Sequence, residues 1–200
     1  MKRAFDFLLA ALGLVGILPL LLVLAIWVKL DSRGPVFYRG VRAGRFGKPF
    51  RIFKFRTMTI DKCDHGAAWT ASNDPRITRC GSTLRHYKFD ELPQLINVIL
   101  GDMSLVGPRP EVLDEVSRYT NEERELLTVR PGITDWASIA FCQEGEILRD
   151  CQDPAETYYR RIRPEKVRLA LEYVRNHSLL IDARILGATL IYVIRGTPQP

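Results

Sequence analysis

The chain has 200 residues, of which 46% are hydrophobic and 26% charged, and its formal net charge is +6. This composition excludes wholesale disorder, and the length favours one compact domain. Four cysteines are too few for a disulfide scaffold, so we expect free thiols in a reducing compartment.

The first predicted element is a membrane helix. From Phe7 to Val28 there are 22 consecutive residues without a charge. A straight helix of that length reaches about 33 Å, close to the ~30 Å hydrocarbon core of a bilayer. A signal peptide would have a shorter apolar run and a small-residue cleavage site after it, and residues 26–30 do not provide such a site.

Two arrangements of this helix stay open, a single span and a re-entrant helix that enters the bilayer and returns. Pro19 lies near the middle of the run, where it removes a backbone hydrogen bond and kinks the helix. Lys2 precedes the run and Lys29 follows it, so the positive-inside rule places both ends on the cytoplasmic side. These features favour a re-entrant helix over residues 1–30 with its bend at Pro19, although Pro also occurs in true spans.

The segment after the helix is strongly basic. Residues 29–56 hold nine Lys or Arg side chains against the single acidic Asp31, which gives a net charge of +8. Each basic residue next to a membrane segment contributes about 1 kcal/mol of favourable free energy to the binding of anionic lipid head groups. We therefore expect this segment to meet lipid or a phosphorylated substrate, with a solvated face and nucleic-acid binding as the alternatives.

Two short strands are predicted within the basic segment, over residues 36–39 and 50–55. Both are rich in aromatic and β-branched residues, and glycine and proline residues separate them. This punctuation predicts a hairpin or a pair of loops.

A helix is predicted after Asp90 and Glu91. Apolar residues at positions 92, 95, 96 and 99 recur at helical spacing, Pro93 suits the first turn and Gly101 suits the end. The two carboxylates then lie at the helix N-terminus, where the helix dipole favours negative charge. Helix capping alone would explain this pair in an arbitrary sequence.

Three further segments carry local signals. Gly107-Pro108-Arg109-Pro110 predicts a fixed loop that displays an arginine, whose planar fork suits phosphate. Residues 120–123 form a capping box that opens another helix. The apolar run over residues 178–195 is interrupted by Asp182 and Arg184, so we expect an interfacial or packing helix and not a second span.

Eight segments together resemble the small monotopic phosphoglycosyl transferases of bacteria, also called the bacterial sugar transferase family, from Lys2 to about Arg195. In chain order they are Lys2-Arg3-Ala4-Phe5-Asp6, Pro19, Gly34-Pro35-Val36-Phe37, Phe53-Lys54-Phe55-Arg56-Thr57-Met58, Asp74-Pro75-Arg76-Ile77-Thr78, Asp90-Glu91-Leu92-Pro93-Gln94-Leu95, Gly107-Pro108-Arg109-Pro110 and Val129-Arg130-Pro131-Gly132-Ile133-Thr134. The chain is similar to the minimal form of the family, without the extra N-terminal spans of larger relatives.

The resemblance implies a mixed α/β fold, mostly helical with short strands. Residues 1–30 would form a re-entrant membrane helix, and residues 31–200 a single cytoplasmic catalytic domain with interfacial amphipathic helices, including one at the C-terminus. Such a protein is monotopic and lies on the cytoplasmic face of the bacterial inner membrane.

The resemblance also implies an activity. The family transfers a sugar phosphate from a UDP-sugar to a polyprenol phosphate, which we expect to be undecaprenyl phosphate, and releases UMP. The reaction runs through a covalent phosphosugar–aspartate intermediate, uses Mg²⁺ and is the first membrane step of glycan synthesis. The implied partners are the UDP-sugar, the polyprenol phosphate and membrane lipids, without nucleic acid, and a homodimer is left open.

Carried onto this sequence, the resemblance makes Asp90 the nucleophile and a Mg²⁺ ligand, and Glu91 the second member of a catalytic dyad. A carboxylate that attacks a diphosphate meets like-charge repulsion, so nearby cations must neutralise the phosphoryl oxygens. The expected substrate-binding cations are Lys54, Arg56, Arg85, Arg109 and Arg130.

This sequence departs from the family pattern at three positions. Leu18 stands before Pro19 where the family often has serine, and Asp135 and Ser138 replace glycine and glutamine around Trp136.

Two other functions remain open from the residues alone. One is a membrane-tethered nucleic-acid-binding protein without enzymatic activity, and the other is a membrane-bound diphosphate hydrolase that uses the same carboxylates.

Overall fold

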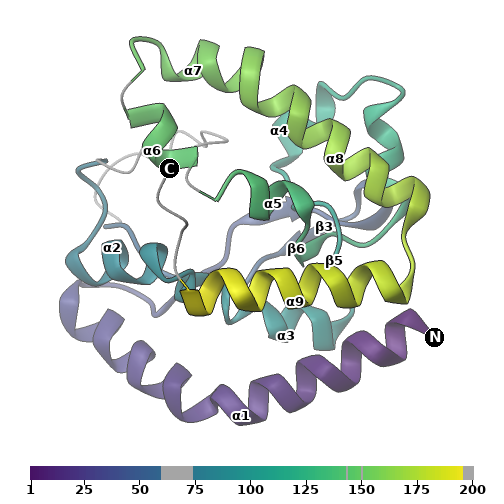
Figure 1. Cartoon of the computed structure of the whole chain (residues 1–200). Coiled ribbons are helices and arrows are strands. Elements are labelled where there is room, and N and C mark those ends of the chain that lie inside the picture. The colour runs from purple at the N-terminus through teal and green to yellow at the C-terminus, as the bar shows by residue number, and fades with distance from the viewer. Residues whose placement is uncertain (60–73, 143, 150, 196–200) are drawn as a thin grey trace.

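The computed structural model describes residues 1–59, 74–142, 144–149 and 151–195. These residues are mostly helical, with three small two-stranded sheets among them. The expected mixture of helices and short strands is therefore confirmed (Figure 1). Cys80, Cys142 and Cys151 are free, as predicted, and Cys63 lies outside the described residues.

The N-terminal helix α1 (Lys2–Asp31) has 30 residues and contains Pro19. It bends in its middle part, and both of its arms lie along the rest of the chain (Figure 1). Ala10 on the first arm packs into the core cluster of α3 and β5, whereas Leu24 and Val28 on the second arm pack into a cluster with α2. A proline has no backbone N–H to donate, which accounts for a bend in an otherwise continuous helix.

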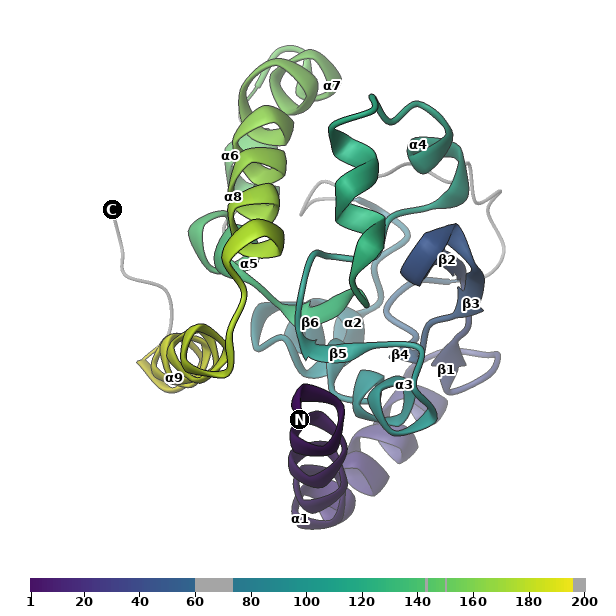
Figure 2. The same cartoon turned by 90° about the vertical axis from the view of Figure 1, so that its right-hand side faces the viewer.

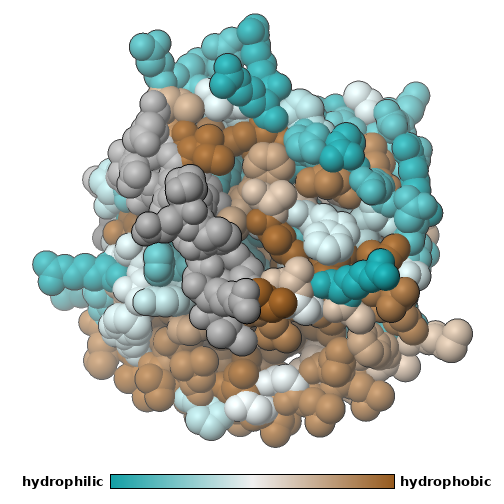
Figure 3. Space-filling view, in the orientation of Figure 1, coloured by the Kyte–Doolittle hydropathy of each residue, from teal (hydrophilic) through white to brown (hydrophobic). Residues whose placement is uncertain are grey.

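Most of the apolar surface of α1 faces away from the domain. Among the described residues, α1 is the one helix long and apolar enough to cross a membrane. Its apolar side chains cover the lower face of the molecule in Figure 3. Leu12 and Val15 are 68% and 73% exposed. This surface requires an apolar environment, as the sequence predicts.

The predicted pairing of the two segments is confirmed, but the strand predicted over residues 50–55 divides into β3 and β4, and β2 lies outside the strand predicted over residues 36–39. β1 (Phe37–Tyr38) pairs antiparallel with β4 (Lys54–Phe55), and β2 (Val41–Ala43) pairs antiparallel with β3 (Pro49–Arg51). The connection between the inner strands is η1 (Arg45–Gly47), a 3₁₀ turn. The β2–β3 pair lies between β1 and β4 along the chain, so the basic segment folds back on itself. As a result, β4 lies against η2.

The predicted helix after Asp90 is confirmed as α3 (Gln94–Leu100), and Gly101 ends it with a φ of 95°. Asp90 and Glu91 lie in a separate 3₁₀ turn, η2 (Phe89–Glu91), between α3 and α2 (Arg79–His86). Lys88 adopts a left-handed conformation just before this turn, with a φ of 58°. The two carboxylates therefore lie in a turn of their own before α3, and not at the N-terminus of α3 where the sequence predicts them.

A short parallel pair lies at the centre of the fold, formed by β5 (Ser104–Val106) and β6 (Gly132–Thr134). Between them the chain forms α4 (Leu113–Ser117) and η3 (Glu123–Thr128). The predicted capping box is confirmed, because Thr120 N–H donates to Glu123 Oε2 (2.8 Å) and Glu123 N–H donates to Thr120 Oγ1 (3.2 Å). It opens a 3₁₀ segment, however, and not an α-helix.

The C-terminal third of the chain is helical, as Figure 2 shows. Its elements are α5 (Trp136–Ala140), α6 (Glu144–Arg149), α7 (Pro154–Thr157), the π-helical η4 (Tyr158–Ile162), α8 (Arg163–Asn176) and α9 (Leu179–Arg195). α9 packs on β5 and β6 through the fully buried Ile185, while Leu180 and Leu190 are 63% and 61% exposed. Both α9 and α1 lie in the lower part of the molecule in Figures 1 and 2.

Candidate active site

The site is centred on Asp90 and Glu91 in η2. Their side chains are 9% and 15% exposed, so two neighbouring carboxylates lie largely out of water. Burial of unpaired charges is costly, and neighbouring like charges repel each other. Both carboxylates therefore need cationic partners.

Lys54 supplies positive charge to both carboxylates. Its Nζ lies 2.8 Å from Glu91 Oε1 and 3.3 Å from Asp90 Oδ2, and β4 carries it to η2. On the loop after β5, Arg109 places Nη2 2.9 Å from the same Glu91 oxygen. Glu91 thus has two cationic partners, and Asp90 shares one of them.

These cations decide the ionisation of Glu91. Burial raises the pKa of Glu91, but Arg109 and Lys54 together outweigh this effect and hold the pKa well below its usual range. In return, Glu91 raises the pKa of Arg109. Glu91 is therefore ionised at neutral pH, and its geometry suits the positioning of two cations better than the donation of a proton.

Arg85 is a third cation on this side of the domain. It extends from α2, and its Nε donates to Thr57 Oγ1 at 3.0 Å. Burial lowers the pKa of Arg85, while the negative charges of Asp90 and Asp74 oppose that shift. The structure therefore brings three of the five expected cations, Lys54, Arg85 and Arg109, into the electrostatic environment of the dyad.

Arg56 is turned away from the dyad. Its guanidinium donates to the carbonyl oxygens of Val28 (3.3 Å), Ser32 (2.8 Å) and Arg33. These carbonyls lie at the C-terminal end of α1 and just after it. Arg56 therefore caps the C-terminal end of α1. These contacts do not match the place among the substrate-binding cations that we expect for it.

Arg130 also lies apart from the dyad. Its Nε donates to the Gly101 carbonyl at 2.9 Å, at the C-terminal end of α3. Asp90 and Glu91 precede the N-terminal end of the same helix, which at seven residues is about 10 Å long. The structure therefore separates Arg130 from the two carboxylates.

Two carboxylates near Arg109 were not among the expected site residues. Burial raises the pKa of Glu111, while Arg109 and Lys166 lower it. Burial likewise raises the pKa of Asp135, whose Oδ1 accepts from Ser138 N–H at 2.7 Å and begins α5. Two features of the sequence indicate these residues. Glu111 directly follows the loop that carries Arg109, and Asp135 and Ser138 have the Asp-x-x-Ser spacing of a helix cap.

The described residues limit how a metal ion could bind here. They contain no group of three or more His, Cys, Asp or Glu side chains arranged to hold a metal. Asp90 and Glu91 are two adjacent carboxylates, and Mg²⁺ commonly takes one or two protein carboxylates together with phosphate oxygens of a substrate. The donor set therefore fits a Mg²⁺ ion shared with a phosphorylated substrate and does not fit a closed protein cage.

The comparisons with known proteins identify the family of this chain. The model of the family described as "Bacterial sugar transferase" matches residues 1–196. A UDP-glucose:undecaprenyl-phosphate glucose-1-phosphate transferase of Xanthomonas campestris pv. campestris is 39% identical over 96% of this chain and 38% of its own length. The exopolysaccharide production protein PSS of Rhizobium leguminosarum bv. phaseoli is 38% identical over 96% of this chain and 94% of its own length.

The name of a third relative contains a different sugar, N-acetylgalactosamine. The UDP-N-acetylgalactosamine-undecaprenyl-phosphate N-acetylgalactosaminephosphotransferase of Aeromonas hydrophila is 36% identical over 98% of this chain and 44% of its own length. The chain thus spans less than half of the Xanthomonas and Aeromonas proteins and nearly all of the Rhizobium protein. The resemblance expected from the eight segments is confirmed, and the chain belongs to the bacterial sugar transferase family.

Proposed function

We propose that this chain transfers a sugar 1-phosphate from a UDP-sugar to undecaprenyl phosphate and releases UMP. The observation that carries the proposal is the buried Asp90 carboxylate beside the ammonium group of Lys54. Glu91 pairs with the same Lys54 and with Arg109, and so holds both cations near Asp90. The named activities of the relatives support the substrate classes. Because those names include both glucose and N-acetylgalactosamine, the sugar is left open.

The first half of the reaction uses Asp90 as the nucleophile. One carboxylate oxygen attacks the phosphorus that bears the sugar, the bond from this phosphorus to the bridging oxygen breaks, and UMP leaves with that oxygen and its electron pair. The phosphosugar is then joined to the Asp90 carboxylate through an acyl phosphate bond. Lys54, Arg85 and Arg109 offset the negative charge that the diphosphate brings to a buried carboxylate.

The second half of the reaction restores the enzyme. A phosphate oxygen of the polyprenol phosphate attacks the same phosphorus, the bond to the Asp90 oxygen breaks, and a polyprenyl diphosphate sugar leaves. One site thereby serves a soluble donor and a lipid acceptor in turn, in a ping-pong sequence. No net proton transfer is needed, which agrees with an ionised Glu91.

Mg²⁺ is the proposed cofactor. When bound, it would supply positive charge to the phosphoryl oxygens of the substrate. Asp90 is the residue that would hold it, because the Glu91 carboxylate is already paired with two cations.

The membrane arrangement is part of the proposal. We infer that α1 is re-entrant and that the domain lies on the cytoplasmic face of the inner membrane, because both arms of α1 pack on the same domain (Figure 1). Phe89, next to Asp90, packs against the cluster that contains Leu24 and Val28 of α1. This contact supports a dyad beside α1, which in a re-entrant arrangement would lie near the depth of a lipid phosphate. The exposed apolar face of α9 would rest in the same interface.

The test is turnover by the Asp90→Asn variant. The purified full chain is supplied with undecaprenyl phosphate, Mg²⁺ and a panel of UDP-sugars, and UMP release is measured. We expect one or a few UDP-sugars to be used by the unchanged chain and none by Asp90→Asn. Asp114→Asn is the matched control, since Asp114 is 75% exposed and lies on α4. Undiminished turnover by a folded Asp90→Asn protein would reject the proposal.

A further inference from the structure

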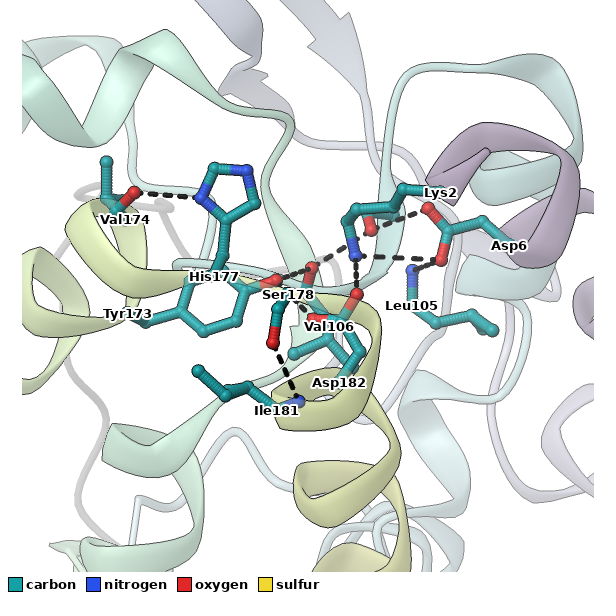
Figure 4. A network of polar contacts seen from close by, with 11 residues as sticks. Lys2, Asp6, Leu105, Val106, Tyr173, Val174, His177, Ser178, Ile181 and Asp182 are labelled. Carbon is teal, nitrogen blue, oxygen red and sulfur yellow. Dashed lines mark hydrogen bonds and ion pairs between the residues drawn. The ribbon is translucent and has the colours of Figure 1, made fainter.

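A second basic site lies at the other end of α3 from the dyad. A pocket there is lined from several parts of the chain, namely the start of α1, the turn η1, the residues before β6 and the end of α8. Its basic lining residues are Lys2, Arg3, Arg45, Arg130 and His177. Figure 4 shows the polar contacts of Lys2 and His177 at this place. The proposed transfer reaction uses none of these residues.

Two arginines of the pocket are anchored in the same way. The Nε of Arg45 donates to the Thr128 carbonyl at 2.8 Å, and the Nε of Arg130 donates to the Gly101 carbonyl at 2.9 Å. Within the described part of the chain, the terminal nitrogens of both guanidinium groups have no hydrogen-bond partner. An arginine held through Nε keeps its two terminal nitrogens as a preorganised fork, which is the geometry that binds phosphate oxygens in pairs.

The acidic side chains near the pocket already have hydrogen-bond or ion-pair partners. Asp6 lines the pocket, but it accepts from Ser104 Oγ (2.8 Å) and Leu105 N–H (3.4 Å) and lies 3.8 Å from Lys2 Nζ. Asp182 takes a direct ion pair with Lys2 at 2.5 Å (Figure 4). The lining contains four lysine or arginine side chains and one carboxylate, that of Asp6. The pocket therefore favours an anion.

The position of the pocket points to a membrane lipid as the source of that anion. The pocket begins at Lys2, and the apolar surface of α1 starts directly after it, with Leu8 and Leu12 59% and 68% exposed. Phospholipid phosphates lie at such a boundary between apolar and polar surface. We propose that this pocket binds the phosphate of an anionic phospholipid, with Arg45 and Arg130 as its paired-oxygen ligands. The proposal is independent of the transferase reaction.

The test compares lipids and variants in the full chain, held in micelles of a neutral detergent. Short-chain phosphatidylglycerol and phosphatidylcholine are titrated, and bound lipid is measured by calorimetry and native mass spectrometry. We expect phosphatidylglycerol to bind more tightly, and each of Arg45→Gln and Arg130→Gln to weaken it by about tenfold or more. Arg124→Gln is the matched control, because Arg124 is an exposed arginine on η3 that does not line the pocket.

Any of three results would overturn the proposal. The first is equal binding of both lipids, and the second is binding of phosphatidylglycerol to Arg45→Gln as tight as to the unchanged chain. The third is binding of inorganic phosphate alone as tight as that of phosphatidylglycerol, which would assign the pocket to a soluble anion. Arg45→Gln keeps the test valid if Arg130→Gln destabilises α3, because the anchoring contact of Arg45 is exposed.

Discussion

The ammonium group of Lys54 lies 3.3 Å from Asp90 Oδ2 and at the same time pairs with Glu91 at 2.8 Å. Under the proposed reaction, this cation must offset the charge that develops when Asp90 attacks a diphosphate. We expect Lys54→Met to lower kcat by about 100-fold or more, since loss of one preorganised charge partner commonly has that effect. Lys48→Met, at an exposed position in the same basic segment, should leave kcat unchanged. Equal kcat values for the two variants would contradict the role given to Lys54.

Glu91 should link stability to pH. Its pKa in the folded chain is well below the ordinary value near 4.5, so the unfolded chain binds more protons as the solution becomes acidic. The stabilisation is therefore fully present above about pH 5 and is lost as the pH falls through 4 toward the folded pKa. We expect the free energy of unfolding of Glu91→Gln to be below that of the unchanged chain at pH 7, with the difference shrinking at pH 4. Denaturant unfolding at several pH values measures this, and a difference that is constant with pH would refute the ion pairs described.

Arg56 should matter for stability and not for substrate affinity. Its guanidinium satisfies three carbonyls at the end of α1, so Arg56→Gln should lower the free energy of unfolding by about 2 kcal/mol. Arg33→Gln, at an exposed arginine of the same connection, is the control. The KM for the UDP-sugar should be the same in both variants. A raised KM for the UDP-sugar in Arg56→Gln, with an unchanged free energy of unfolding, would show that Arg56 binds substrate and would contradict this prediction.

The two ends of α1 should be reached from one side of the membrane. Ala4 and Leu30 are exposed, and cysteines placed there in a cysteine-free background report the topology with a membrane-impermeant reagent. We expect labelling of both positions in inverted vesicles and of neither in intact cells. Labelling of the two positions from opposite sides would establish a single span.

Local patterns were sufficient to predict several elements of the fold. The length of α1, the span of α3 with its glycine end, the paired strands and the capping box at Thr120 each depend on residues a few positions apart. The Lys54 and Arg109 contacts agree with the cations expected around the dyad. These features could be predicted because helix periodicity, turn residues and charge chemistry act over short stretches of chain.

Contacts between distant segments could not be predicted in this way. Lys54 and Arg56 are two residues apart, yet Lys54 points to η2 and Arg56 reaches the end of α1, because β4 ends at Phe55. Asp182 interrupts an apolar run and would be expected to face water, but it is 1% exposed and pairs with Lys2 from the other end of the chain. Its buried place depends on how α1 and α9 pack together, and no pattern within either helix indicates that packing.

The most direct measurement of the central proposal is the mass of the protein after a single half-reaction. The full chain is mixed with its UDP-sugar and Mg²⁺ in the absence of a lipid acceptor, quenched within the first turnover and analysed intact and as peptides. The account predicts one UMP released per chain and a phosphosugar on the peptide that contains Asp90, which disappears when undecaprenyl phosphate is added. UMP release that requires both substrates together, with no modified peptide at any time, would contradict it.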